Sequence, residues 1–398
     1  MKKTALQLTM HRVKNYGSVL QAYALNHFIN SLQGWECKVI DLMPNVPGVD
    51  VSGNSFGAAI LKSLRLVTSV FKRPSARTVR AVFAPYRRWY ENRFLLLPYA
   101  RIFDRFVEEE ILKTTKYATE DDLFRSPPDA DVYITGSDQT FNPRFTKGAP
   151  VWFLEFVRLS ADGCCRKISY ASSIAASGLS EGMKLVYKQG LANFDALSFR
   201  ENTGVDVAAK LGFVAQHCCD PTLLLTKEEW ERFAAKATVN VGEKYILVYN
   251  LRYMVDPYPL SAEVERRVQD ELGIKIVYLN GPIVTRPCKN SIHIWKVTPH
   301  DFVKLFLDAS FIITDSFHGT AFSLISGNPF ISFVHGVRQS DSRVMDLLET
   351  CGAQRHAVVV QPFLKWHLSI DGYASSANEQ CGLIRFRDRS RQWIMNSI

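Results

Sequence analysis

The chain has 398 residues, of which 47% are hydrophobic and 22% are charged, and its formal net charge is +9 at pH 7. This length exceeds one ordinary hydrophobic core, so a soluble protein of two or three domains is expected. No apolar run approaches the ~20 residues that a membrane span needs, and the eight cysteines include no C-x-x-C pair of the kind that binds zinc or carries out redox chemistry. We therefore expect a cytoplasmic protein with reduced thiols, no bound metal and no signal peptide.

The excess positive charge lies largely between residues 62 and 105, where basic and apolar residues alternate as in two amphipathic helices broken near Pro74. One interpretation is a solvated basic face on helices that pack against a core. The alternative is docking on anionic lipid, which would hold the protein peripherally at the inner face of the plasma membrane. No nucleic-acid-binding signature is present, so nucleic acid is not an expected partner. The basic residues concerned include Lys72, Arg73, Arg77 and Arg80.

The chain begins with a βαβ pattern. Residues 6–10 are predicted to form a strand, residues 18–34 a helix and residues 37–42 a second strand, parallel to the first. The first turn lacks the G-x-G-x-x-G fingerprint, so a nicotinamide dinucleotide is not indicated. That turn holds Asn15, Tyr16 and Gly17, which form either a plain loop or a tight turn that brings backbone close to a ligand.

Three later strands deliver polar residues to the carboxyl-terminal edge of this sheet, where ligands bind in open α/β folds. Ser137 and Asp138 follow the first of them, and Arg200 and Glu201 follow the last. An arginine at this edge can hold a carboxylate or phosphate through two parallel hydrogen bonds. The alternative is a structural ion pair of Arg200 with Glu201 or Asp220. The predicted strands are residues 131–135, 168–172 and 196–199.

A domain boundary is predicted near residue 226, because Pro221 stiffens a turn and Thr226 with Glu229 forms a capping box that starts a new helix. The α/β alternation then restarts. We expect a first domain over residues 1–225 with a basic helical insertion at about 58–125, and a second domain over residues 226–378. A helix over residues 379–398 is expected to pack back on the first domain. The predicted elements of the second domain are strands 245–251, 275–279, 311–313 and 330–334 and helices 263–272, 298–307 and 320–326.

Residues 311–327 hold a histidine where a buried strand passes into a helix that ends at Gly327. The first N–H groups of that helix and its dipole suit an anion, and His318 adds a titratable proton near neutral pH. Asp315, Ser316 and Thr320 share the turn. His318 is thus either part of a functional site or a capping and space-filling group beside the sheet.

The ordered set of motifs resembles the polysaccharide pyruvyl transferase family. The resemblance implies a GT-B-like fold with two Rossmann-like domains, whose mostly parallel sheets face a central cleft. It also implies transfer of pyruvate from phosphoenolpyruvate to two hydroxyls of a sugar in a cell-surface or exopolysaccharide precursor, which gives a ketal. The motifs that carry the resemblance are Asn15–Leu25, Gly136–Gln139, Ser169–Ser173, Ser198–Glu201, Asp220–Leu224 and Thr314–Thr320.

The predicted catalytic residues are His318, Arg200 and Asp315. In the family, the arginine and histidine of the matching motifs are associated with phosphoenolpyruvate binding and catalysis, and Asp138 or Asp315 is our expected base. No cofactor is expected beyond the donor, and the acceptor is a sugar or a lipid-linked oligosaccharide; the oligomeric state is open. The predicted substrate-binding residues are Asn15, Tyr16, Gly17, Ser137, Asp138, Glu201, Ser316, Phe317, Gly319 and Thr320.

Two other functions are compatible with the sequence. A GT-B glycosyltransferase with a nucleotide-sugar donor would share the architecture and the anion-binding helix end, and fold analogy does not separate it from a pyruvyl transferase. A non-catalytic module could bind acidic glycans or a membrane through the basic helices. It would need the basic residues and would not need His318.

Overall fold

The structure, a computed structural model, describes residues 2–43, 97–157, 165–176, 178–251, 260–279, 288–334, 342–359 and 370–398. Most of the predicted basic helices, with Lys72, Arg73, Arg77 and Arg80, lie outside these residues, so their role stays a prediction. Within the described ranges, the search for a helix that could span a membrane finds none.

The first part of the chain forms a seven-stranded parallel sheet with the strand order β3-β2-β1-β4-β5-β6-β7. The order reverses between β1 and β4, and in open α/β sheets ligands bind at the carboxyl ends of the strands at such a point. Its strands are β1 (Lys3–Leu8), β2 (Trp35–Leu42), β3 (Lys113–Tyr117), β4 (Val132–Thr135), β5 (Arg166–Ser172), β6 (Ala196–Phe199) and β7 (Gln216–His217). Its helices are α1 (Tyr16–Ser31), α4 (Leu97–Glu110), α5 (Glu120–Arg125), α6 (Pro143–Thr146), η2 (Pro150–Phe153), α7 (Glu181–Leu191), α8 (Asn202–Lys210) and η3 (Pro221–Leu224).

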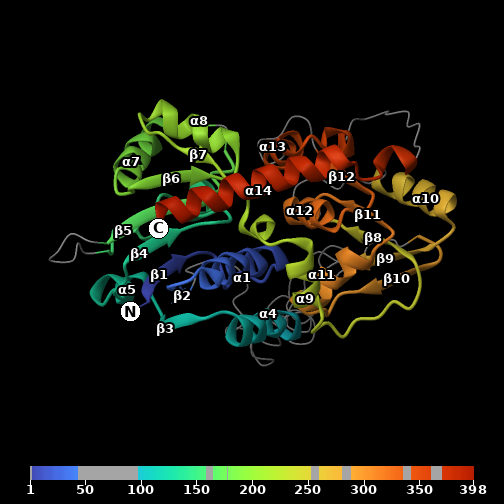
Figure 1. Cartoon of the computed structure of the whole chain (residues 1–398), viewed down its shortest axis with the longest axis horizontal. Helices are drawn as coiled ribbons and strands as arrows, with labels where there is room; N and C mark the ends of the chain where they lie inside the picture. Colours follow the sequence, from blue (N-terminus) through green and yellow to red (C-terminus); the bar gives the residue numbers. More distant parts are fainter. Residues whose placement is uncertain are drawn as a thin grey trace, which may run out of the picture.

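The second part repeats this arrangement in a six-stranded parallel sheet with the order β10-β9-β8-β11-β12-β13. Here the reversal falls between β8 and β11 (Figure 1). Its strands are β8 (Tyr245–Tyr249), β9 (Lys275–Leu279), β10 (Ser291–Ile294), β11 (Phe311–Thr314), β12 (Phe330–Val334) and β13 (Ala357–Val359). Its helices are α9 (Lys227–Ala234), α10 (Leu260–Leu272), α11 (Pro299–Asp308), α12 (Phe317–Ser326), α13 (Ser342–Cys351), η5 (Gln354–His356) and η6 (Ile370–Tyr373).

Two Rossmann-like sheets in one chain give the α/β, GT-B-like fold that the sequence predicts, and this prediction is confirmed. One hydrophobic core runs through both halves. The ring of Tyr16 from α1 stacks on Phe302 from α11 with centroids 4.5 Å apart, and its hydroxyl donates to the Val297 carbonyl at 3.0 Å. The two halves are therefore held together by apolar burial as well as by polar contacts.

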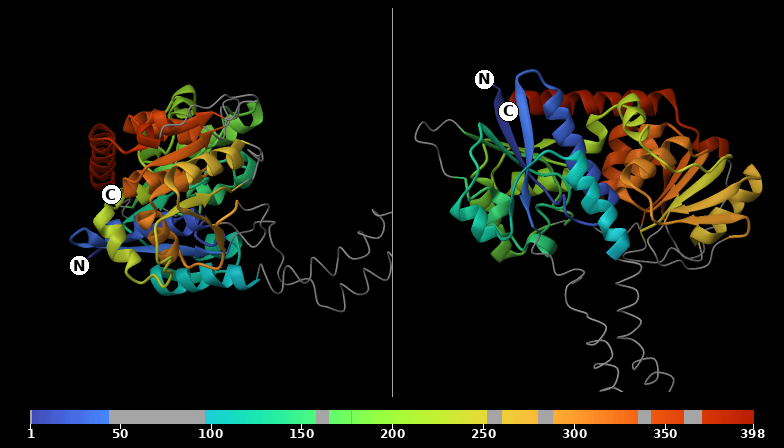
Figure 2. Two further views of the ribbon diagram at one scale, coloured as in Figure 1. Left: turned by 90° about the vertical axis from the view of Figure 1, so that its right-hand side faces the viewer. Right: turned by 90° about the horizontal axis from the view of Figure 1, so that it is seen from below.

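The final helix, α14 (Ala377–Ser397), runs along both halves (Figures 1 and 2). Near its start, the Gln380 side chain donates to the Leu324 carbonyl of α12 at 3.3 Å. Further along, Arg387 donates to the Leu223 carbonyl at 2.7 Å, and Ser390 accepts from the Cys219 N–H at 2.9 Å. Helix α14 thus contacts the second half first and the first half last.

One prediction about the first half needs correction. We expected a helical insertion to continue to residue 125, but Lys113–Tyr117 forms β3, an edge strand of the main sheet. The strand is polar because it lies at an edge, and only Tyr117 among its residues is buried. Such a strand lacks the alternation of apolar residues that identifies strands in a sequence.

Candidate active site

Helices α1 and α12 begin at the carboxyl-terminal edges of the two sheets, and their first turns meet. Asn15 caps α1 by accepting from the Gly17 N–H at 2.8 Å, and Ser316 caps α12 by accepting from the Gly319 N–H at 3.2 Å. A Cβ placed on Gly17 would lie 2.0 Å from His318 Nδ1, so the imidazole lies directly against the first turn of α1. Two positive helix ends therefore converge beside one histidine, an arrangement that favours an anion.

Arg200, directly after β6, is 3% exposed. Its Nη1 donates to Asp220 Oδ2 at 2.8 Å, and its guanidinium carbon lies 4.3 Å from the centre of the Phe317 ring. Among the described residues, Nε and Nη2 have no hydrogen-bond partner, and Asp138 Oδ1 lies 3.8 Å from Nη2. Burial opposes the charge on Arg200, but Asp220 and Asp138 outweigh it and raise its pKa. Once an anion reaches it, the Nε and Nη2 edge of this charged guanidinium can donate two parallel hydrogen bonds.

Asp220 is the carboxylate at the centre of this cluster and is 1% exposed. Its Oδ1 accepts from the Thr222 N–H at 3.0 Å and from the Thr222 hydroxyl at 2.8 Å. Its Oδ2 accepts from Arg200 and from the Ser137 hydroxyl at 3.3 Å, and it lies 3.5 Å from His318 Nε2. Burial would raise the pKa of Asp220, but His318 and Arg200 hold that pKa well below its usual range.

The turn after β4 brings Ser137 and Asp138 to the same place. A Cβ on Gly136 (φ +117°) would lie 2.2 Å from the Tyr170 carbonyl oxygen, so only glycine fits there. Asp138 itself has a φ of +59°, in the left-handed region, and its Oδ2 accepts from the Ser18 hydroxyl at 2.6 Å. The predicted site residues Ser137 and Asp138 therefore lie beside Arg200 and its partner Asp220.

Glu201 is fully buried beside this cluster. Its Oε1 accepts from the Ser173 hydroxyl at 3.0 Å and from the N–H groups of Ile174 at 2.7 Å and Ala175 at 2.9 Å. These bonds fix the chain after β5 against the start of α8. Within the described part of the chain its Oε2 has no hydrogen-bond partner, and the role of Glu201 in substrate binding stays a prediction.

Other predicted site residues have structural partners in this conformation. Tyr16 is 3% exposed and belongs to the core between the halves. The Thr320 hydroxyl lies 3.0 Å from the Ser316 carbonyl and 2.6 Å from the Ser332 hydroxyl, behind the first turn of α12. The structure thus gives both residues a packing role, and contact of either with a substrate stays a prediction.

Asp315 and Gly319 shape the turn between β11 and α12. Oδ1 of Asp315 accepts from the Leu251 N–H at 2.5 Å, which ties this turn to the end of β8. A Cβ on Gly319 would lie 2.2 Å from Thr314 Oγ1, so glycine lets the helix approach the strand end closely. The bond to Leu251 gives Asp315 a structural partner, and its catalytic role stays a prediction.

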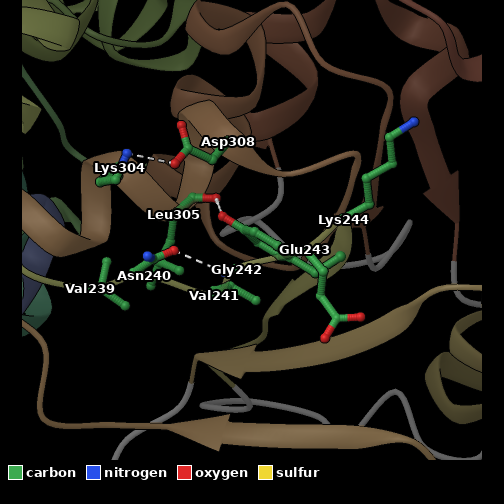
Figure 3. A pocket seen from close by; sticks show the side chains of 10 residues that line it. Val239, Asn240, Val241, Gly242, Glu243, Lys244, Lys304, Leu305 and Asp308 are labelled. Carbon is green, nitrogen blue, oxygen red and sulfur yellow. Dashed lines mark hydrogen bonds and ion pairs between the residues drawn. The ribbon is translucent and has the colours of Figure 1, made fainter.

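A cavity of about 460 Å³ lies at the other edge of the second sheet, where β8 begins (Figure 3). Several of its polar groups already have partners: Lys304 pairs with Asp308 at 2.7 Å, Glu243 pairs with Lys275 at 2.6 Å, and the Tyr245 hydroxyl donates to the Leu305 carbonyl at 2.8 Å. It therefore offers less to a ligand than the unpaired groups around Arg200. Among the described residues, no three His, Cys, Asp or Glu side chains are grouped as a metal site would require.

Sequence reasoning missed two members of the cluster and undervalued a third. Ser18 holds Asp138, and Thr222 holds Asp220 through two hydrogen bonds. Asp220 was considered only as a structural partner of Arg200. The signal was nevertheless present, because an Asp-Pro-Thr sequence is typical of a capped turn whose carboxylate faces inward.

The parallel order of both sheets and the paired helix ends define an α/β protein of GT-B architecture with a candidate anion site between its halves. The chain belongs to the polysaccharide pyruvyl transferase family, whose model matches residues 15–336. None of the curated proteins compared with the chain matches it.

Several solved structures are similar along the whole chain. MnaA from S. aureus, solved with UDP, has 10% identity and a TM-score of 0.49, with 100% of this chain and 98% of that chain covered. A UDP-GlcNAc 2-epimerase from Neisseria meningitidis, bound to UDP-GlcNAc, has 8% identity and a TM-score of 0.47, with 100% of both chains covered. A putative UDP-N-acetylglucosamine 2-epimerase from Listeria monocytogenes has 10% identity and a TM-score of 0.46, with 98% of this chain and 91% of that chain covered.

Proposed function

We propose that the protein transfers pyruvate from phosphoenolpyruvate to two hydroxyls of a sugar in a cell-surface or exopolysaccharide precursor, and so forms a pyruvate ketal. The observation that carries this proposal is the unpaired Nε and Nη2 edge of Arg200 beside two helix N-termini. Phosphoenolpyruvate has a carboxylate and a phosphate. A guanidinium edge and a pair of helix ends are two anion receptors of the kinds that these groups need.

His318 fits the proton chemistry of this reaction. A proton delivered to C3 of the enol makes C2 cationic, and a first sugar hydroxyl then bonds to C2 and loses its proton. Phosphate leaves with the pair of electrons of its C–O bond, and a second hydroxyl closes the ketal and loses its proton. One hydroxyl proton thus replaces the proton placed on C3, and the other leaves with phosphate. A positioned imidazole that can give up a proton suits the first transfer.

The base that receives the hydroxyl proton is proposed from position. Asp138 lies 3.8 Å from Arg200 Nη2 and is part of the cluster, whereas Asp315 contacts the end of β8. Asp138 is therefore the first choice, and Asp315 the second. The scheme requires no cofactor besides the donor, because Arg200 and the helix ends supply the positive charge.

Donor entry requires movement. Nε and Nη2 of Arg200 have almost no accessible surface, so an anion reaches them only when nearby side chains or the two halves shift. Movement of this kind on substrate binding is common among enzymes with two facing domains. An acceptor that binds between the halves would then meet the donor at the place where α1 and α12 converge.

Isothermal titration with phosphoenolpyruvate tests the proposal. Arg200→Ala would leave Asp220 as an unpaired buried charge, which destabilises proteins strongly. Arg200→Lys keeps the charge and loses the planar fork, so we expect donor affinity to fall at least ~10-fold with the fold retained. Arg125→Lys is the control, because Arg125 is an exposed arginine of α5.

Activity is tested with phosphoenolpyruvate and a panel of lipid-linked and free oligosaccharides. The expected products are inorganic phosphate and an oligosaccharide heavier by one pyruvate less one water. Binding of a nucleotide sugar in place of phosphoenolpyruvate, with transfer of its sugar, would contradict the proposal and favour a glycosyltransferase. Absence of phosphate release with every acceptor, together with absence of donor binding, would also contradict it.

A further inference from the structure

The two carboxylate oxygens of Asp220 have different partners. Oδ1 receives both hydrogen bonds from Thr222 and so fixes the carboxylate to its own turn. Oδ2 faces Arg200 Nη1 at 2.8 Å from the first half of the chain and His318 Nε2 at 3.5 Å from the second half. A single oxygen thus lies between the residue proposed to hold the donor and the residue proposed to protonate it.

We propose that Asp220 is a positioning residue that holds the Nε2–H of His318 and leaves Nδ1 as the nitrogen that meets the donor. This inference rests on the proposed function. It assigns Asp220 a part in the reaction beyond its ion pair with Arg200. Hydrogen bonds between catalytic groups are often long before substrate binds, and 3.5 Å is within a small ring movement of hydrogen-bond length.

The position of the other ring nitrogen supports the assignment. Nε2 is buried and has no hydrogen-bond partner among the residues that the structure describes, and it faces the Asp220 carboxylate, whose pKa lies well below its usual range. Nδ1 faces the first turn of α1, since a Cβ on Gly17 would lie 2.0 Å from it. That turn is one of the two helix ends proposed to receive the donor anion. The ring therefore has Nε2 toward Asp220 and Nδ1 packed against Gly17, and Nδ1 meets the donor only after the two halves move apart.

The proton path follows from this orientation. In the doubly protonated ring, Nδ1–H gives its proton to C3 of the enol, and the remaining Nε2–H tautomer is held by Asp220. The neutral Nδ1 then accepts a proton from an attacking hydroxyl directly or through Asp138, so the ring returns to its starting state. A carboxylate that fixes the tautomer and stabilises the imidazolium has the same function in serine-protease triads.

Several charged and titratable groups surround the pair. Arg200 and Asp138 lie on the first half, and Asp220 also interacts electrostatically with Cys219 and Tyr170 behind it. Of these groups, Asp220 is the one that lies against the imidazole within the described residues, with its Oδ2 3.5 Å from Nε2. A carboxylate that only anchored Arg200 would leave the tautomer of His318 unaffected, and this difference can be measured.

Nitrogen NMR of the histidine-labelled protein is the first experiment, with His318→Gln used to assign the signal. We expect the neutral imidazole of His318 in the unmodified chain to carry its proton on Nε2. A neutral ring protonated on Nδ1 would overturn the proposal without any variant. The measurement needs neither donor nor turnover, so it is independent of the proposed function. If His318 carries its proton on Nε2 but the protein neither binds phosphoenolpyruvate nor transfers pyruvate, the proposed function is wrong and the pairing of His318 with Asp220 is still supported.

Asp220→Asn is the second experiment, because asparagine keeps the shape and removes the charge. We expect kcat to fall at least ~100-fold and the alkaline limb of the kcat/KM profile to move to lower pH, since the imidazolium loses its anion. Asp346→Asn is the matched control: Asp346 accepts the Asn202 N–H at 2.8 Å at another contact between the halves. The proposal is wrong if the Asp220→Asn protein is folded, the alkaline limb of its kcat/KM profile stays in place and the tautomer of His318 is unchanged. Asp220 would then be only a structural partner of Arg200.

Discussion

Gly17 and His318 are in contact although 300 residues separate them in the sequence, and the contact leaves no room for a side chain on Gly17. Gly17 belongs to the first turn of α1, and His318 belongs to the first turn of α12. The glycine therefore sets the distance between the two helix ends. It also sets the position of the imidazole relative to Asp220, which lies on its other side.

Gly17→Ala tests this contact. The added methyl would displace the His318 ring or push the helix ends apart, so we expect pyruvyl transfer to fall at least ~100-fold, as small displacements of catalytic groups do. Overpacking is expected to cost about 1–3 kcal/mol of unfolding free energy. Activity assays and urea unfolding measure the two effects.

Gly182→Ala is the matched control for this variant. Gly182 occupies the corresponding second position of α7, and nothing lies within 4 Å of a Cβ built there. Alanine at that position should raise stability by a few tenths to ~1 kcal/mol and leave transfer unchanged. Equal activity of the Gly17 and Gly182 variants would show that the contact with His318 has no function.

His318→Ala is expected to lower kcat by at least two decades, about the ~10²–10⁴-fold that a positioned acid contributes, while the protein stays folded. The side chain is 11% exposed and lies at the junction of the two halves. Circular dichroism and a thermal melt check the fold. His27→Ala is the control, because His27 is exposed. Near-normal pyruvyl transfer by the His318 variant would show that His318 has no part in the mechanism.

Phe317→Leu tests how Arg200 is held. The ring lies 4.3 Å from the guanidinium carbon, and a cation–π contact of this kind contributes about 0.5–2 kcal/mol. We therefore expect the affinity for phosphoenolpyruvate to fall about 2- to 30-fold by titration. Phe145→Leu, on an exposed ring of α6, is the control. Unchanged donor affinity in the Phe317 variant would mean that the ring does not orient Arg200.

The contacts of Glu379, near the start of α14, predict that the stability of the protein depends on pH. Burial would raise the pKa of Glu379, but Arg355, the Ser376 N–H and His356 lower it from 4.5 to about 2. A pKa that is lower in the folded state stabilises the protein above pH 4.5, and this contribution is lost as the pH falls toward about 2. Urea unfolding between these pH values should show a decline of up to ~3 kcal/mol.

Glu379→Gln separates this carboxylate from the others. The variant should be less stable at neutral pH, because Gln cannot pair with Arg355, and its stability should fall less steeply below pH 4.5. A decline as steep as that of the unmodified protein would assign the acid sensitivity to another group, with Asp220 as the next carboxylate to examine.

The strand–turn–helix at residues 311–327 was accessible from sequence because its signals agree. Phe311–Thr314 is apolar and fully buried, Ser316 caps the helix, and Gly327 ends it with a φ of +71°. The ends of β6, β9 and β12 were likewise predicted as found. Long apolar runs and capping residues act over a few neighbours, so they can be interpreted without knowledge of the fold.

Other features depend on contacts that no local pattern contains. Strands β7 and β13 have two and three residues and are strands only because a neighbouring strand pairs with them. The approach of Gly17 to His318 and the shared oxygen of Asp220 arise from the docking of two halves. The sequence predicts that Arg200 and His318 lie at two sheet edges, and the family resemblance assigns both to one site. Only the structure shows that Asp220 contacts both of them.

The path of α14 determines where the chain can be cut to exchange its second Rossmann-like unit. Because the chain returns to the first half through Arg387 and Ser390, the second Rossmann-like unit is inserted into the first and is not simply appended to it. Its two junctions lie side by side, where Arg387 reaches the Leu223 carbonyl. Residues between these junctions can be exchanged among relatives as one cassette with two neighbouring splice points. A simple carboxyl-terminal truncation would instead remove a piece of the first unit's own core.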